Sequence, residues 1–246
     1  MDQHSWRHYS ELRPDELAEI VKTTPTAYWP LGLLEHHGWH LPVGFDGIKA
    51  ERLCERLAQR TGGVVLPVMW WGGAGGHGDF LWTLYQSEDA ARDIVINTTE
   101  RLITFGFRNI VLLMGHYPWE GIAGKPLDAL QSRYPQALIL WGTEATIGRP
   151  DLYLPGDHAA REETSYGLSL LPDLVKMTAL TTGRDESAWP YATPVAPDKR
   201  YPGVRYDPAD PLFAQMGEDA RTATAERGEA AISHLVDVLA QRILTH

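Results

Sequence analysis

Three kinds of side chain that can bind a metal lie within a short stretch that directly follows an apolar run. Residues 35–42 read Glu-His-His-Gly-Trp-His-Leu-Pro, a carboxylate follows at Asp46, and the apolar run spans residues 27–34. Carboxylate oxygens and imidazole nitrogens bind borderline divalent ions such as zinc or manganese, and a carboxylate can bridge two ions. The stretch therefore indicates a metal site at a strand end and metal-assisted hydrolysis. The alternative is a loop that happens to hold three histidines.

Two further segments carry residues of the same kinds. In residues 114–121, Gly115 would let the backbone turn sharply off a strand and present His116 at the mouth of a cleft, although a lone histidine there is more often a surface or capping residue. In residues 156–165, His158 and Glu163 are candidates for chemistry. The rest of that segment is typical of a capped helix start with solvated charges.

Short apolar runs alternate with amphipathic stretches along the chain, which predicts an α/β layered fold with a mainly parallel sheet. The pattern predicts strands at 27–34, 64–69, 110–114 and 137–141, and helices at 48–60, 91–105, 121–134 and 219–243. Active sites of such folds lie beyond the carboxyl ends of the strands. The candidates obey this rule, because Glu35, His37 and Asp46 follow the first strand, His77 the second and His116 the third. Residues 183–217 are predicted to form a long ordered excursion over the surface.

Composition narrows the function further. The chain has 246 residues, 43% of them hydrophobic, which suffices for one domain over residues 1–246 with a single core. A formal net charge of −10 without a basic cluster argues against a nucleic-acid partner, so a small-molecule partner is expected. The single cysteine, Cys54, is expected to be a buried, inert thiol. No apolar stretch is long enough to cross a membrane, so the expected location is the cytoplasm, with no membrane partner.

Five ordered motifs together resemble the creatininase (creatinine amidohydrolase) family. They lie at residues 35–46, 72–83, 106–117, 157–165 and 223–229. The first matches the family pattern Glu-Gln-His-Gly-x-His-Leu-Pro followed by Asp, with His36 in place of glutamine. In the other motifs, Leu81-Trp82 stands where Pro-Gly is expected, and Met114 replaces Asn in the Asn-Gly-His motif. The resemblance spans nearly the whole chain and implies a three-layer α/β/α fold.

The resemblance implies an amidohydrolase with two divalent ions, zinc and/or manganese, with iron also allowed. Glu35 and His116 would bind one ion, His37 the other, and Asp46 would bridge them. In creatininase a glutamate follows the Gly-His-Tyr motif where this chain has Pro118, so the last ligand must come from elsewhere. Glu163 is the first choice and Glu120 the second. The resemblance also implies a homo-oligomer, a hexamer in this family.

The resemblance assigns catalytic roles as well. His158 matches the family's proton shuttle and Tyr117 a tyrosine that contacts substrate. An imidazole can take a proton from activated water and pass it to the departing nitrogen. His40 and His77 are expected to orient ligands or line the pocket. The residues predicted to bind substrate are Tyr117, His77, Trp82, Trp119 and Asp157.

The departures from the family pattern determine which substrate we expect. Five tryptophans in or beside the motifs favour a flat, apolar-walled pocket for a ring or planar amide; they are Trp39, Trp70, Trp71, Trp82 and Trp119. Two segments tied to creatinine specificity differ here, at residues 115–119 and 154–157. We therefore expect hydrolysis of another small amide, cyclic amide or formamide. The alternatives are a metal-dependent isomerase or lyase, or a catalytically silent small-molecule binder.

Overall fold

The centre of the molecule is a parallel sheet of five strands in the order β1-β3-β2-β4-β5. The computed structural model describes residues 5–147, 156–182 and 188–246. The strands are β1 (Trp6–His8), β2 (Thr26–Leu31), β3 (Gly63–Val65), β4 (Asn109–Met114) and β5 (Leu138–Gly142). Every pairing between neighbouring strands is parallel.

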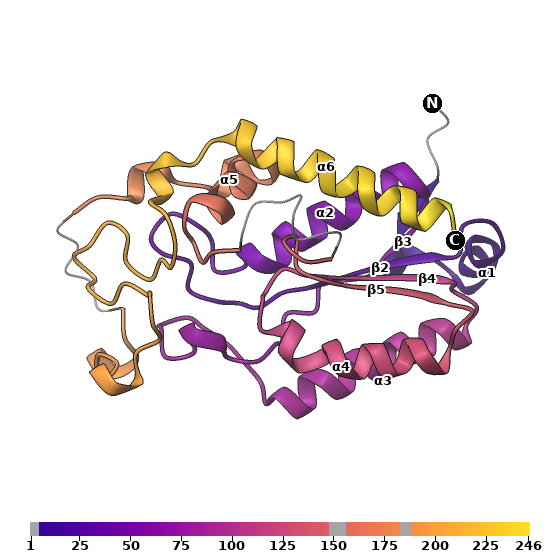
Figure 1. Ribbon diagram of the computed structural model, residues 1–246, viewed down its shortest axis with the longest axis horizontal. Helices are drawn as coiled ribbons and strands as arrows, with labels where there is room; N and C mark the ends of the chain where they lie inside the picture. Colours follow the sequence, from indigo (N-terminus) through magenta and orange to yellow (C-terminus); the bar gives the residue numbers. More distant parts are fainter. Residues whose placement is uncertain (1–4, 148–155, 183–187) are drawn as a thin grey trace.

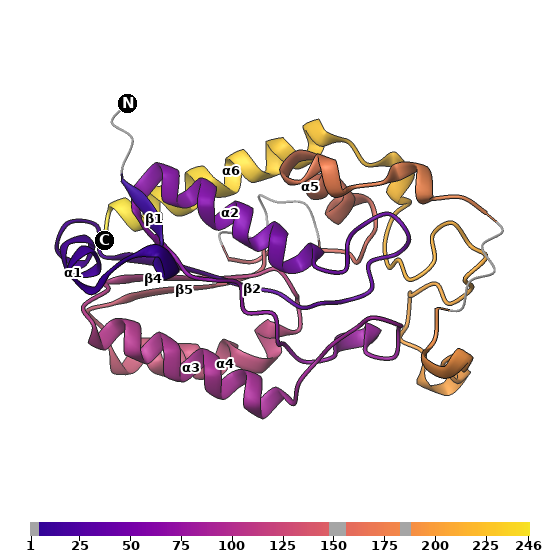
Figure 2. The same ribbon diagram turned by 180° about the vertical axis from the view of Figure 1, so that it is seen from behind.

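Helices cover both faces of this sheet (Figure 1). On one face lie α2 (Phe45–Thr61), α5 (Arg161–Leu170) and α6 (Ala225–Leu244), and on the other lie α3 (Glu88–Thr104) and α4 (Trp119–Arg133). The same layers appear from behind (Figure 2), where α1 (Pro14–Thr23) lies at the end of the molecule that holds both termini. The predicted α/β/α layering is confirmed.

The strands explain why two helical layers are needed. All six residues of β2 and all six of β4 are buried, as expected for central parallel strands covered on both faces. Along β2, Ala27, Trp29 and Leu31 belong to the core shared with α3 and α4, whereas Tyr28 belongs to the core shared with α2 and α6. Alternate side chains therefore build two separate cores on the two faces of one sheet.

Several element boundaries differ from the prediction. The first strand ends at Leu31 rather than 34, and β3 ends at Val65 rather than 69, shortly before Pro67, which cannot donate to a strand ladder. The last helix begins at Ala225 rather than 219, because the Thr224 hydroxyl accepts from the backbone N–H of Arg227 and caps it there. The sequence reading missed β1 and α1, and α1 buries none of its residues.

Within the predicted surface excursion, residues 188–217 lie at the end of the molecule opposite the termini (Figure 1). Residues 183–187 fall outside the described part. The described part forms short 3-10 turns and one isolated bridge rather than α-helices or strands. It is ordered by a small core of its own, in which Trp189 and Phe213 pack against Phe80. Among the described residues, no helix is long and apolar enough to span a membrane.

Candidate metal centre and active site

The candidate ligands come together at the carboxyl edge of the sheet. Glu35 and His37 follow β2, Asp46 lies in the first turn of α2, His116 follows β4 and Glu163 lies in the first turn of α5. All five side chains are buried. The close approach depends on Gly115, because a Cβ atom at that position would collide with the carbonyl oxygen of Asp46.

One half of the site consists of Glu35, Asp46 and His116. The Nδ1 atom of His116 lies 2.9 Å from Glu35 Oε2 and 3.2 Å from Asp46 Oδ2. Its Nε2 atom donates to the carbonyl oxygen of Gly73 at 2.9 Å. Because a carbonyl can only accept, Nε2 carries a hydrogen, and Nδ1 is the nitrogen left to face the two carboxylates. Ligand atoms of these three residues lie within 4.8 Å of one another.

The other half consists of His37, Asp46 and Glu163. Here Nε2 of His37 lies 3.0 Å from Asp46 Oδ1 and 3.5 Å from Glu163 Oε2, while Nδ1 donates to the carbonyl oxygen of Glu35 at 3.1 Å. The two oxygens of Asp46 thus face different halves, Oδ1 toward His37 and Oδ2 toward His116. This is the arrangement that a bridging carboxylate requires.

The charges of the site favour cations. Burial alone would lower the pKa of His37, but Asp46, Glu163 and Glu35 together raise that pKa to about 9. Burial likewise opposes the charge on His116, yet Glu35 and Asp46 raise its pKa to about 10. For Asp46, burial would raise the pKa, but His37 and His116 hold it well below its usual value. Positive charge is therefore stabilised at both histidine positions.

The donor set fits divalent metal ions. His37 Nε2 and Asp46 Oδ2 are buried atoms without a hydrogen-bond partner among the described residues, although each has an oppositely charged neighbour. Buried polar atoms normally have a partner, and bound ions are one explanation for exceptions. Imidazole and carboxylate ligands on two adjoining triads suit zinc or manganese. The residues that could hold these ions are Glu35, His37, Asp46, His116 and Glu163.

A cavity of about 310 Å³ opens onto four of these five side chains, namely Glu35, Asp46, His116 and Glu163. Its lining includes His77, Tyr117, Asp157 and His158, which the sequence had singled out. Tyr201 and Met216, from the surface excursion, also line it and were not predicted. No local motif marks these two residues, because the folding of the surface excursion, and not a nearby sequence pattern, brings them to the cavity.

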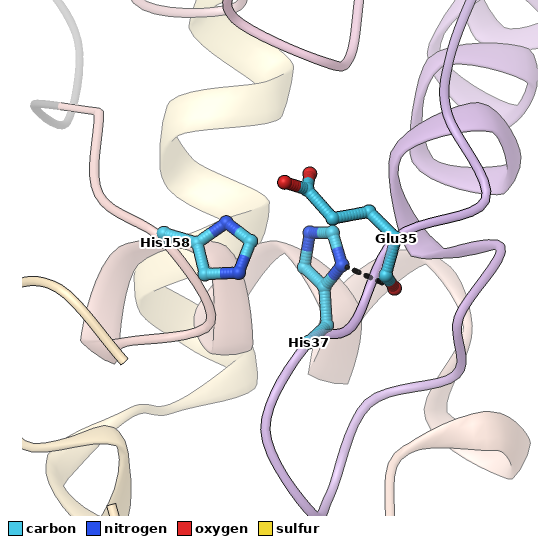
Figure 3. A group of neighbouring side chains, drawn as sticks. All are labelled: Glu35, His37 and His158. Atoms are coloured by element: carbon cyan, nitrogen blue, oxygen red, sulfur yellow. Dashed lines mark hydrogen bonds between the residues drawn. The ribbon is translucent and has the colours of Figure 1, made fainter. Parts of the chain in front are cut away.

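His158 lies beside the second half of the site, facing His37 and the carboxylate of Glu35 (Figure 3). Its Nε2 atom donates to the carbonyl oxygen of His36 at 2.9 Å, so the lone pair of the neutral ring is on Nδ1. Two backbone hydrogen bonds with Met216 hold its main chain. Burial first, and then His77 and His37, keep the pKa of His158 well below its ordinary value. A neutral imidazole can accept a proton.

His158 could also serve as a ligand. Together with Glu35 and His37 it forms a third group of potential metal ligands. The ring of His77 stacks on it, with the centroids 3.6 Å apart, and His77 Nε2 donates to the carbonyl oxygen of Ala214. His40, by contrast, is not in the described cavity lining, and its Nε2 atom lies 2.8 Å from the hydroxyl of Thr164. This contact links the loop after β2 to α5, which carries Thr164.

The two candidates for the last ligand have different surroundings. Glu163 is buried, with one oxygen toward His37. Glu120 belongs to none of the three ligand groups, and its Oε1 atom accepts from the backbone N–H of Thr143 at 3.2 Å and from the hydroxyl of Thr146. Glu120 thus holds the loop that follows β5. The geometry favours Glu163 as the last ligand.

The described cavity lining contains no tryptophan. Trp119 is fully buried in the core beneath the sheet, where its indole N–H donates to the carbonyl oxygen of Gly32 at 3.0 Å. Trp82 is 68% exposed. The structure therefore does not bring Trp82 and Trp119 into the cavity. The aromatic side chains in its described lining are Tyr117 and Tyr201, with the three histidines His77, His116 and His158.

Sequence reasoning missed two buried charges behind the site, Lys49 and Glu144. The ammonium of Lys49 lies 2.7 Å from Glu144 Oε1 and 2.8 Å from Glu163 Oε1, and the Tyr117 hydroxyl donates to the same Glu144 oxygen. A signal for each was available. Lys49 lies one helical turn after Asp46, and Glu144 follows β5, where the strand-end rule applies again.

Comparison with known proteins shows the family of the chain. The family model for creatininase, described as creatinine amidohydrolase, matches residues 10–243. A creatinine amidohydrolase from Pseudomonas putida is 26% identical over 97% of this chain and 94% of its own length. A mycofactocin precursor peptide peptidase from Mycobacterium ulcerans is 28% identical over 95% of this chain and 90% of its own.

Solved structures of this family share the fold. A crystal structure of creatinine amidohydrolase superimposes with a TM-score of 0.74 at 25% identity, covering 99% of this chain and 97% of the other. The match to the creatininase family model and relatives shows that the chain is an amidohydrolase, and the clustered histidines and carboxylates at the carboxyl edge of its sheet are consistent with metal dependence. The chain belongs to the creatininase family.

Proposed function

We propose that this protein hydrolyses the C–N bond of a small amide, cyclic amide or formamide with the help of two divalent ions, zinc and/or manganese, with iron also possible. The observation that carries the proposal is the shared carboxylate of Asp46, whose two oxygens face two separate imidazole–carboxylate groups. Glu35 and His116 complete one group, and His37 and Glu163 the other. Two bound ions would supply an acidified water and a polarised carbonyl.

The chain's own residues have the remaining tasks. His158 accepts a proton at Nδ1 and passes it to the departing nitrogen, because its Nε2 hydrogen is fixed on the His36 carbonyl. Tyr117 lines the cavity beside His116 and contacts the substrate, while His77 and Asp157 line the walls. Asp157 also accepts from the backbone N–H groups of Glu162 and Glu163, which orients the start of α5.

The size of the cavity supports a small substrate. About 310 Å³ suits a compact molecule rather than a folded polypeptide. The relatives named above act on creatinine and on a peptide, and both names describe chemistry at a carbon–nitrogen bond. We infer that this chain also acts on a carbon–nitrogen bond, and that its substrate is a small amide.

Metal analysis of matched variants tests the proposal. The wild-type chain should hold about two ions, and Glu163→Gln should lose the second while keeping the first, because the variant keeps the size of the side chain but removes its charge. Glu120→Gln is the matched control and should keep both. A panel of lactams, linear amides and formamides then tests hydrolysis. Retention of two ions by Glu163→Gln would contradict the ligand assignment, and product formation without water uptake would favour an isomerase or lyase.

A further inference from the structure

Behind the second half of the site lies a buried ammonium group that the catalytic roles above do not use. Lys49, on α2, is fully buried. Its partners Glu144 and Glu163 are also buried, and their sequence positions are 95 and 114 residues from it. A buried charge is costly unless it is paired, so this ammonium is held in place by its two carboxylates.

The contacts of Glu163 show what this ammonium controls. Glu163 Oε1 accepts from Lys49 at 2.8 Å, while Oε2 accepts from the backbone N–H of Ala159 at 2.8 Å and lies 3.5 Å from His37 Nε2. Both oxygens are therefore restrained, and only Oε2 faces His37. Removal of the Lys49 contact would leave the Ala159 N–H as the one hydrogen bond among the described residues that restrains the carboxylate, and would loosen its orientation.

The same ammonium reaches toward the substrate side. Glu144 Oε1 accepts from Lys49 and from the hydroxyl of Tyr117, both at 2.7 Å, and the ammonium lies 5.0 Å from the centre of the Tyr117 ring. Tyr117 lines the cavity, whereas Lys49 and Glu144 do not appear in its lining. One continuous chain of contacts thus joins the carboxylate near His37 to the tyrosine that lines the cavity.

We propose that Lys49 is a positioning residue: its ammonium holds Glu163 with one oxygen toward His37 and Asp46, and through Glu144 ties that orientation to the hydroxyl of Tyr117. The proposal rests on the proposed function, in which Glu163 completes the second half of a two-ion site. Partners that hydrogen-bond to a metal-binding carboxylate fix its direction, and their removal typically weakens metal affinity by about 10- to 100-fold.

Stepwise titration of the metal-free chain with Mn²⁺ or Zn²⁺, followed by calorimetry, tests the proposal. Lys49→Met keeps the length of the side chain without its charge. It should weaken the second binding step by about 10- to 100-fold and leave the first unchanged. Lys49→Arg keeps a cation that can bridge two carboxylates and should restore much of the affinity. Lys125→Met, on the exposed side of α4, is the control for loss of one positive charge and should match the wild type.

Lys49→Met leaves Glu144 without its ion-pair partner and could fail to fold. The double variant Lys49→Met/Glu144→Gln removes both charges, a kind of replacement that folded proteins often tolerate. It should fold and still show the weakened second step. If Lys49 acts only by positioning, saturating metal should also restore most of kcat in these variants, which would not happen if Lys49 took part in the chemistry.

The outcomes separate the two proposals. A wild-type chain that binds fewer than two ions overturns the two-ion function and the role of Lys49 together. Two ions in the wild type, with a second-step affinity in Lys49→Met or in the folded double variant within about twofold of the wild type, overturn the role of Lys49 alone. Equal weakening of both steps also overturns it, because a positioning role predicts a selective effect.

Discussion

At the scale of single residues, hydrogen bonds to backbone carbonyls set the orientation of the histidines. His37 and His116 each donate from one ring nitrogen to a carbonyl oxygen and turn the other toward the carboxylates. His158 follows the same rule with the His36 carbonyl. Such contacts fix the tautomer and the ring direction before any ligand binds. The site is therefore held in place by the folded chain itself.

His158 has two possible roles that one variant separates. His158→Ala should keep the metal content of the wild type and lower turnover by about two to four powers of ten, the usual contribution of a positioned acid–base group. Elemental analysis and single-turnover rates measure the two effects. Loss of an ion from this variant would instead make His158 a ligand, in line with its position in the group with Glu35 and His37.

Residues with local signals could be predicted from the sequence, and those with only distant partners could not. The predicted residues Glu35, His37, Asp46 and His116 lie in short motifs after apolar runs, and the structure brings them together. Lys49 contacts residues far along the chain, so its role depends on the fold. Trp119 was expected to bind substrate because it lies beside a motif, but the structure buries it in the core. Sequence proximity to a motif does not determine the direction of a side chain at the start of a helix.

At the scale of elements, close backbone approach brings β4 and α2 together. The loop after β4 passes the first turn of α2 at Gly115, with no room for a side chain. That approach places His116 beside Asp46. Buried strands such as β2 and β4 were predictable because they are continuous apolar runs, whereas β1 and α1 are short or exposed and carry little apolar pattern.

Gly115 and Gly121, six positions apart, make a matched pair of test sites. Gly115→Ala should destabilise the chain and weaken metal binding, because its new Cβ atom would force the Asp46 carbonyl away. Gly121→Ala, in the first turns of α4, has nothing within 4 Å of its new Cβ atom and should be neutral or stabilise by up to about 1 kcal/mol through helix propensity. Thermal unfolding and metal titration measure both. Equal stability of the two variants would contradict the packing argument.

At the scale of the whole molecule, the resemblance to the family predicts a homo-oligomer. Large apolar side chains are exposed within residues 71–85; they are Trp71, Trp82, Leu84 and Tyr85. Clustered exposed apolar groups often mark contacts between chains. Light scattering after size exclusion should give a mass several times 27.5 kDa for the wild type and a smaller mass for Leu84→Glu. A wild-type mass of one chain would contradict the expectation.

Metal binding should stabilise the fold as a whole, because the candidate ligands come from α2, α5 and the loops after β2 and β4. A ligand that binds only the folded state at a hundred times its Kd adds about 2.7 kcal/mol of stability. In a chain of this size, that corresponds to a rise in Tm of about 5 to 10 °C. Scanning calorimetry with and without zinc or manganese measures the shift, and a chelator should reverse it. Asp46→Ala, which loses the shared carboxylate, should show little or no shift. An equal shift in that variant would mean that the ions stabilise the molecule from another site.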